Sequence, residues 1–319
     1  MLRACLVSLA LISASASLFA QTPAAAPPKA AAPYVYIKPA PTGELVGIGG
    51  RRLHIDCKGD AEGPAVIFEA GLSQFTAHSG YGKAQDLIAP FARVCTYDRA
   101  GFGWSDPAAG TRTQQDMVED LHKLLAAKRL KGPFVLVGHS MGGLYARLYA
   151  KRYPADVAAI VLVDATPEAY LYAPGAAEVR KGLVAKIAEG LNAKGVKEGV
   201  PMVPMERGTP DEVAMAFTPQ IFRTMKQEYE AIDLVPEALR EPNGYGTLGD
   251  KPLGVIRRDI ADPPVAADEG WAELQQGLAA LSTRGFLVVA EKSGHAIPYE
   301  NPQVVADTVR RVLSEVGKR

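Results

Sequence analysis

The chain has 319 residues, with 35 Lys and Arg against 35 Asp and Glu, so its formal net charge is zero and it carries no basic footprint for nucleic acid. Hydrophobic residues make up 48% and charged residues 22%, the balance of an ordinary globular protein. These values exclude wholesale disorder, collagen-like repeats and a polytopic membrane protein, and the length suits one large domain or two small ones.

Residues 1–20 differ in composition from the rest of the chain. A positive charge at Arg3 precedes an apolar run over 6–19 that contains many small residues, and Ala14-Ser15-Ala16 and the Ala20/Gln21 junction are candidate cleavage sites. This pattern predicts a secretory signal peptide. We therefore expect a mature protein that is periplasmic or secreted.

Residues 21–42 are rich in Ala and Pro. Because such a composition buries too little apolar surface to offset chain entropy, it predicts a disordered linker. Beyond residue 20 no stretch approaches the roughly 20 apolar residues that a spanning helix needs, so we expect no integral membrane span in the mature protein.

From about Gly43 the chain alternates between short apolar runs and helical patterns. Strands are predicted at 51–56, 65–69, 93–97, 134–137, 159–163, 253–256 and 286–290, and a helix with one apolar face is predicted at 116–128. Strands that alternate with helices form right-handed βαβ units, so the sequence predicts an α/β fold with a doubly wound, mostly parallel sheet. Ligands of such sheets bind at the carboxyl ends of the strands.

A Gly-X-Ser-X-Gly motif stands directly after the apolar run at 134–137, and it reads Gly138-His139-Ser140-Met141-Gly142. Helical composition follows it, so the serine lies at a strand-to-helix turn. Glycines flank the serine in this turn because a Cβ two residues away collides with the neighbouring strand or helix. The first N–H groups of the helix face the serine and can hold a developing oxyanion. We interpret Ser140 as a nucleophile.

Two further segments accompany this turn. They read Cys95-Thr96-Tyr97-Asp98-Arg99-Ala100-Gly101-Phe102-Gly103-Trp104-Ser105-Asp106 and Ser293-Gly294-His295-Ala296-Ile297-Pro298, the latter followed by Glu300-Asn301-Pro302. Together with the serine motif, and in the same order, they resemble segments of the α/β-hydrolase superfamily from about Leu53 to the C-terminus. The resemblance implies the α/β-hydrolase fold and acyl transfer by an activated serine.

The general base is predicted from the order Ser, acid, His that this fold uses. Of the five histidines, only His295 follows Ser140 in the chain, so it is the predicted base. His139, inside the serine motif, is expected to point away from the nucleophile. No pair of histidines has metal-ligand spacing, and we predict neither a metal nor another cofactor.

The triad acid has two candidate positions. Asp164 follows the strand just after the serine motif's helix, and the resemblance implies that this is one of two known locations. The other location follows the strand at 253–256, where Asp262 is the better candidate and Asp259 the second. The sequence narrowly favours Asp164, although an Asp there is also able to cap the following segment.

The oxyanion hole is expected to combine two backbone N–H groups. One belongs to Met141, the residue after the nucleophile, and the other to Leu72, in the loop that follows the strand at 65–69. Gly71 permits the turn in this loop, where many members of the superfamily carry His-Gly. Glu69 is either an orienting group for this loop or the polar end of a strand.

Two cysteines, Cys57 and Cys95, remain once the signal peptide with Cys5 is removed. The superfamily's strand order places their strands side by side, which implies a disulfide between them in an oxidising compartment. A pair of buried thiols is the alternative.

An insertion over about 167–250 interrupts the strand pattern, with helices predicted at 176–191 and 211–231. Its position resembles that of the helical cap that roofs the pocket in this superfamily. Soft and aromatic side chains in it are able to line an acyl or alcohol site, but packing of the cap onto the core explains most of them equally well.

These observations predict a secreted serine hydrolase that cleaves small-molecule carboxylic esters through an acyl-enzyme. The same triad also serves peptidases, lactonases, thioesterases and carbon-carbon bond hydrolases. A ligand-binding protein with an inactive triad is the alternative from another class. The sequence does not indicate the oligomeric state.

Overall fold

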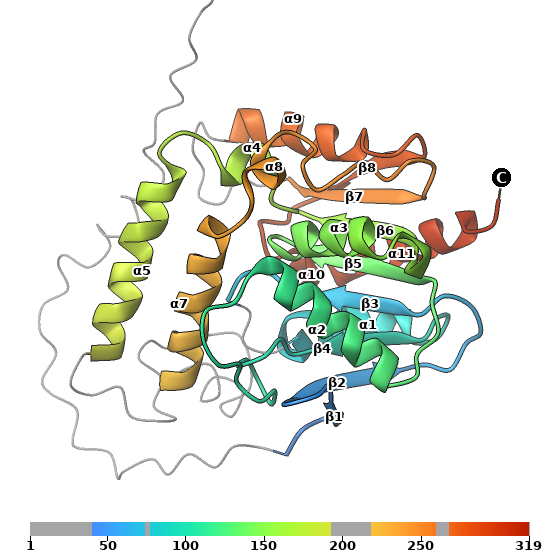
Figure 1. Ribbon diagram of the computed structural model, residues 1–319. Coiled ribbons are helices and arrows are strands. Elements are labelled where there is room, and N and C mark those ends of the chain that lie inside the picture. Colours follow the sequence, from blue (N-terminus) through green and yellow to red (C-terminus); the bar gives the residue numbers. More distant parts are fainter. Residues whose placement is uncertain (1–39, 74–76, 193–217, 260–267, 319) are drawn as a thin grey trace, which may run out of the picture.

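The structure is a computed structural model that describes residues 40–73, 77–192, 218–259 and 268–318 (Figure 1). Residues 1–20, predicted as a signal peptide, and most of the predicted linker at 21–42 lie outside this part of the chain. In the described ranges no helix is long and apolar enough to cross a membrane.

One eight-stranded sheet organises the molecule, with the strand order β1-β2-β4-β3-β5-β6-β7-β8. The first two pairings in this order are antiparallel and the others are parallel. The strands are β1 (Glu44–Gly47), β2 (Arg52–Lys58), β3 (Val66–Glu69), β4 (Val94–Tyr97), β5 (Phe134–His139), β6 (Val157–Val163), β7 (Leu253–Arg258) and β8 (Gly285–Ala290). The predicted mostly parallel α/β fold is confirmed.

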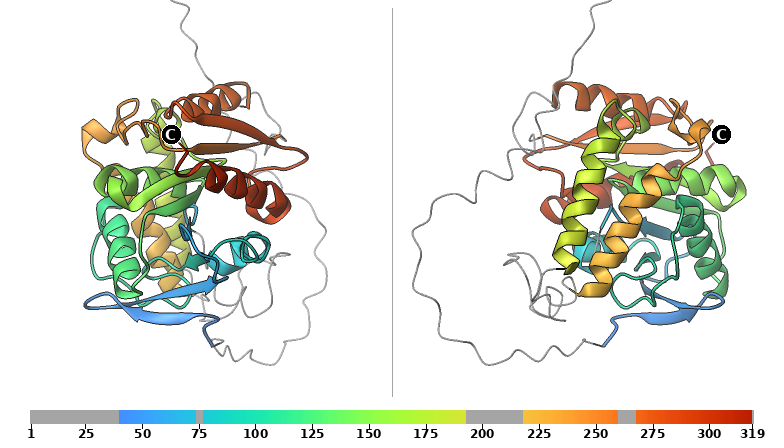
Figure 2. Two further views of the ribbon diagram at one scale, coloured as in Figure 1. Left: turned by 90° about the vertical axis from the view of Figure 1, so that its right-hand side faces the viewer. Right: turned by 60° about the vertical axis from the view of Figure 1, so that its left-hand side comes forward.

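Most helices lie on the two faces of the sheet, and α5 and α7 lie beyond the carboxyl ends of its parallel strands (Figures 1 and 2). They are α1 (Ala77–Ile88), α2 (Gln114–Ala127), α3 (Gly142–Arg152), α4 (Glu168–Leu171), α5 (Ala176–Asn192), α7 (Pro219–Asp233), α8 (Glu237–Arg240), α9 (Asp268–Ala279), α10 (Ile297–Glu300) and α11 (Pro302–Glu315), with a short 3₁₀ turn at Pro154–Asp156. Two helices from the insertion, α5 and α7, pack side by side (Figures 1 and 2).

The alternation of side chains along the central strands builds two hydrophobic layers. Phe134 and Leu136 of β5 join the layer that α2, α3 and α9 cover, whereas Val135 and Val137 join the layer under α1 and α11. Because both faces are covered, β5 is buried along its whole length, as the unbroken apolar run at 134–137 predicts.

Three details differ from the sequence prediction. The four-residue strand β1 is not predicted by the pattern, because it is short, only partly buried and followed by the Gly-rich turn at 47–50. The predicted helix at 211–231 corresponds to α7, which begins at Pro219 after the N-cap Thr218 and continues to Asp233; residues 193–217 are outside the described part. The other strands and helices whose ranges the sequence predicts differ from the observed ones by a few residues at their ends.

Cys57 and Cys95 form a disulfide between β2 and β4. The two residues are direct partners in the antiparallel register, with a Cα–Cα distance of 4.1 Å. The structure thus joins the two cysteines that the resemblance pairs.

Candidate active site

Ser140 occupies the turn between β5 and α3 and has a φ of +54°, which is in the left-handed region. The turn requires glycine on both sides. A Cβ on Gly138 would lie 2.5 Å from the carbonyl oxygen of Gly142, and a Cβ on Gly142 would lie 2.2 Å from the carbonyl oxygen of Glu69. The Ser140 N–H donates to the carbonyl of Val163 at the end of β6, at 3.0 Å. These constraints project the Ser140 side chain beyond the carboxyl edge of the sheet.

His295 and Asp164 lie next to this serine. Nε2 of His295 is 3.0 Å from Oγ of Ser140, and Nδ1 of His295 is 2.6 Å from Oδ2 of Asp164. A carboxylate at Nδ1 fixes the proton on that nitrogen, which leaves Nε2 as the acceptor for the Ser140 hydroxyl. The three side chains come from loops after β5, β6 and β8, so the sheet brings together residues that are far apart in the sequence.

The carboxylate of Asp164 is fully buried and accepts further hydrogen bonds. Oδ1 accepts from the backbone N–H of Arg258 at 3.1 Å and from Nε1 of Trp271 at 2.8 Å, and Oδ2 accepts from Nη1 of Arg258 at 2.8 Å. Burial alone raises the pKa of Asp164. The hydrogen bond and charge of His295, with the donors from Arg258 and Trp271, outweigh burial and hold this pKa below its usual value. Asp164 is therefore an anion at neutral pH.

Of the two predicted acids that the structure describes, Asp164 and Asp259, it is Asp164 that contacts His295. Asp259, at the end of β7, instead accepts a hydrogen bond from the backbone N–H of Lys292 at 3.2 Å. Asp262 lies outside the described residues.

The His139 side chain contacts the loop that carries His295. Its Nε2 is 2.8 Å from the carbonyl oxygen of His295, to which it donates. Burial, followed by the charge of His295, lowers the pKa of His139 to about 3. His139 is therefore neutral at pH 7 and acts as a fixed hydrogen-bond donor.

The two predicted oxyanion donors flank the serine. Gly71 is so close to Ser140 that a Cβ on Gly71 would lie 3.2 Å from the Cβ of Ser140. Within the described ranges, no acceptor is bonded to the backbone N–H of Leu72 or Met141. Both N–H groups therefore lack an acceptor within the described ranges and lie close to Ser140 in the chain or in space.

A buried ionic cluster, which sequence reasoning misses, lies behind this loop. The Arg99 side chain is 4% exposed and pairs with Glu69 at 3.1 Å and with Glu228 of α7 at 2.6 Å. Burial, partly offset by the positive charge of Arg99, raises the pKa of Glu69 to about 6. Glu69, the last residue of β3, also accepts a hydrogen bond from the hydroxyl of Tyr97.

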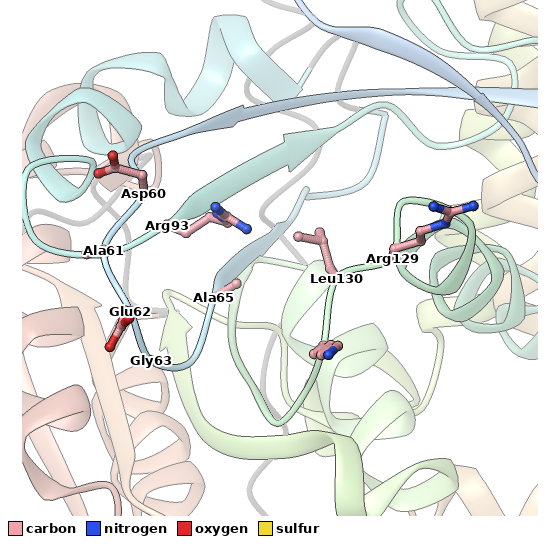
Figure 3. Close-up of a pocket in the computed structure, with 9 residues that line it drawn as sticks. Asp60, Ala61, Glu62, Gly63, Ala65, Arg93, Arg129 and Leu130 are labelled. Carbon is pink, nitrogen blue, oxygen red and sulfur yellow. The ribbon is translucent and has the colours of Figure 1, made fainter.

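A hollow of about 380 Å³ lies elsewhere on the surface (Figure 3). Its lining includes Ala65 and Arg93, which immediately precede β3 and β4, so it opens at the amino ends of these strands. Acidic and basic side chains both line it: Asp60, Glu62, Arg93, Arg129 and Lys131. It is therefore separate from the edge that carries Ser140.

Comparisons with known proteins agree with this fold. The Alpha/beta hydrolase family matches residues 63–308. The uncharacterized protein YqjL of Bacillus subtilis is 24% identical over 268 residues, which cover 81% of this chain and 87% of that protein.

Two solved structures show the same fold. A thermophilic esterase of Thermogutta terrifontis has a TM-score of 0.63 at 20% identity, with 85% of this chain and 97% of that chain covered. An enol-lactonase of Burkholderia xenovorans has a TM-score of 0.60 at 20% identity, with 85% of this chain and all (100%) of that chain covered. Since the family match extends over most of the sequence and includes Ser140, Asp164 and His295, this chain belongs to the Alpha/beta hydrolase family.

Proposed function

We propose that the protein is a serine hydrolase that cleaves carboxylic esters, with Ser140 as nucleophile, His295 as general base and acid, and Asp164 as the acid that orients His295. The supporting observation is the continuous pair of hydrogen bonds from Ser140 Oγ through the His295 ring to Asp164. The buried, ionised carboxylate holds the imidazole in one tautomer and stabilises the imidazolium that forms during the reaction.

The proposed reaction has two halves. Oγ of Ser140 attacks the ester carbonyl while its proton moves to Nε2 of His295, and the N–H groups of Met141 and Leu72 hold the oxyanion. Collapse of this intermediate expels the alcohol, which takes the proton from Nε2. Water, deprotonated by the same nitrogen, then attacks the acyl-enzyme, and as the carboxylic acid leaves, Nε2 returns the proton to Oγ of Ser140.

We further propose that α5 and α7 form the cap of the insertion at about 167–250 and roof the substrate site. Contacts between α7 and the core support this role. Nε2 of Gln220 donates to the carbonyl of Gly101 at 3.1 Å, and the Glu228 carboxylate pairs with Arg99. Residues 1–20 are proposed as a signal peptide and residues 21–42 as a linker, and export to an oxidising compartment agrees with the Cys57–Cys95 disulfide.

A chain-length series of p-nitrophenyl esters, from acetate to dodecanoate, tests the activity. We expect saturable turnover by the wild-type protein and none above background by Ser140→Ala. The chain length with the highest kcat/KM measures the depth of the acyl site. If the wild-type protein and Ser140→Ala are equally inert towards esters and lactones, the ester hydrolase assignment is wrong and a ligand-binding role replaces it.

A further inference from the structure

Side chains hold several backbone groups of the loop at residues 70–73, which lies beside Ser140. The carbonyl of Ala70 accepts from Nη1 of Arg99 at 2.7 Å, and the N–H of Gly71 donates to the hydroxyl of Tyr81 at 3.2 Å. The carbonyl of Gly71 accepts from Nη2 of Arg99 at 2.7 Å. The N–H of Leu72 is left for the oxyanion.

The bond to the Gly71 carbonyl fixes the direction of this free N–H. That carbonyl and the Leu72 N–H belong to one planar trans peptide unit and point in opposite directions. Arg99, which holds the carbonyl on one side, therefore aims the N–H on the other. The positive charge of Arg99 beside the Gly71 carbonyl also polarises this peptide unit, which makes the Leu72 N–H a stronger hydrogen-bond donor.

Glu228 holds the next peptide unit. Its Oε2 accepts from the N–H of Ser73 at 2.9 Å, and its Oε1 accepts from Nε of Arg99 at 2.6 Å. The peptide units before and after the Leu72 Cα are thus attached to Arg99 and Glu228, and these two side chains are also bonded to each other. Because the Glu228 residue is only 2% exposed, water does not readily replace these contacts.

Glu228 comes from α7, in the insertion, whereas the loop belongs to the core of the fold. Ser73 and Glu228 are 155 residues apart in the sequence. The bond to the Ser73 N–H and the pairing of Arg99 with Glu228 therefore exist only while α7 is seated on the core.

We propose that Glu228 is a positioning residue that aims the Leu72 N–H at the oxyanion, through Ser73 on one side and Arg99 on the other, and so makes the oxyanion hole depend on the seating of α7. This inference rests on the proposed function, because it assumes an oxyanion at Ser140. It assigns to the insertion a part in the chemical step in addition to covering the substrate.

The substitution Glu228→Gln tests this role with little change in volume. The site presents two donors, the Ser73 N–H and Nε of Arg99, and a carboxylate accepts from both, whereas an amide has one oxygen and turns its NH₂ towards the second donor. Glu69 still balances the charge of Arg99, so the variant retains a paired cation and is expected to fold. Glu230→Gln is the matched control, because Glu230 lies on the same helix and pairs with Lys226 near the surface.

We expect Glu228→Gln to lower kcat for an ester substrate about 10- to 100-fold, somewhat less than the loss of a whole oxyanion donor, with KM changed by less than about threefold. The inhibition constant of an aryl trifluoromethyl ketone, which forms a tetrahedral oxyanion on Ser140, should rise by the same factor as kcat/KM falls. Hydrogen exchange measured by mass spectrometry should become faster in a peptide that contains Ser73. Glu230→Gln should leave all three quantities unchanged.

Unchanged kcat, ketone affinity and exchange in folded Glu228→Gln, in an active wild-type background, would overturn the positioning role and leave the ester hydrolase standing. A parallel increase in KM without a loss of kcat would also overturn it, because it would show a role in substrate binding. A wild-type protein that neither turns over esters nor binds the ketone would overturn the proposed function, and this inference with it.

Discussion

Nδ1 of His295 lies 2.6 Å from Oδ2 of Asp164, although 131 residues separate them in the sequence. The Asp164 carboxylate is fully buried, and its pKa is held below its usual value. An ionised acid in this position selects one imidazole tautomer, so its charge should matter more than its shape.

The substitution Asp164→Asn is therefore expected to lower kcat about 10³- to 10⁴-fold, because an amide no longer fixes the proton on Nδ1. Asp259→Asn is the control, since Asp259 contacts the backbone of Lys292 instead. The kcat values of Asp164→Asn, Asp259→Asn and Asp262→Asn on one ester, measured by steady-state kinetics, show which carboxylate the reaction needs. If Asp259→Asn or Asp262→Asn is the more damaging change, Asp164 is not the triad acid.

Trp271 donates its indole N–H to Asp164 and should tune the same carboxylate. We expect Trp271→Phe to lower kcat about tenfold. The change removes one hydrogen bond to the charged Asp164 carboxylate and leaves an aromatic ring, a phenyl group, in place of the indole. The chain offers a matched control in Trp104→Phe, whose ring packs on His54 away from the triad. Equal kcat values for the two variants would show that the indole N–H has no role in activity.

The pKa of His139, lowered to about 3 by burial, predicts how stability depends on pH. An unfolded histidine has a pKa near 6.5, so below that pH the unfolded state binds a proton that the folded state excludes. This contribution to stability is complete above pH 6.5 and is lost as the pH falls towards 3.

His139→Gln removes this titration while it keeps a donor for the His295 carbonyl. Between pH 6.5 and pH 4 we expect the free energy of unfolding of the wild-type protein to fall by roughly 3 kcal/mol more than that of the variant. Urea unfolding at a series of pH values gives both curves. Parallel curves would mean that the pKa of His139 is the same in the folded and unfolded protein, and would contradict this prediction.

The disulfide between Cys57 and Cys95 should contribute to stability chiefly through the unfolded chain. It closes a loop with a sequence separation of 38, so the double variant Cys57→Ala/Cys95→Ala is expected to lose about 4 kcal/mol in the free energy of unfolding. Guanidinium unfolding of oxidised, reduced and double-variant protein provides the comparison. Equal midpoints for the oxidised and reduced forms would contradict this expectation.

The sequence predicts those parts of the fold that depend on local patterns. The buried run before Ser140 identifies β5, the glycines around Ser140 identify the turn, and the position of His295 after Ser140 identifies the candidate base. The acid is harder, because Asp164 and Asp262 each follow a strand whose carboxyl end meets the same edge of the sheet. Only the distance to His295 separates them, and sequence spacing does not encode that distance.

The contacts behind the site are not visible in the sequence at all. Arg99 and Glu228 are 129 residues apart, and Glu228 lies in an amphipathic helix where a charged residue normally faces solvent. Trp271 and Arg258 likewise look like ordinary residues of a helix and a strand end. Their partners become apparent only when the sheet order brings β6, β7 and α9 together.

The most direct test of Ser140 as the nucleophile is covalent labelling by a fluorophosphonate, read by intact mass and by peptide mapping. The account predicts one adduct per chain, located on Ser140, together with loss of esterase activity at the same rate and no adduct on Ser140→Ala. A wild-type protein that stays unlabelled, or an equal adduct on Ser140→Ala, would contradict it.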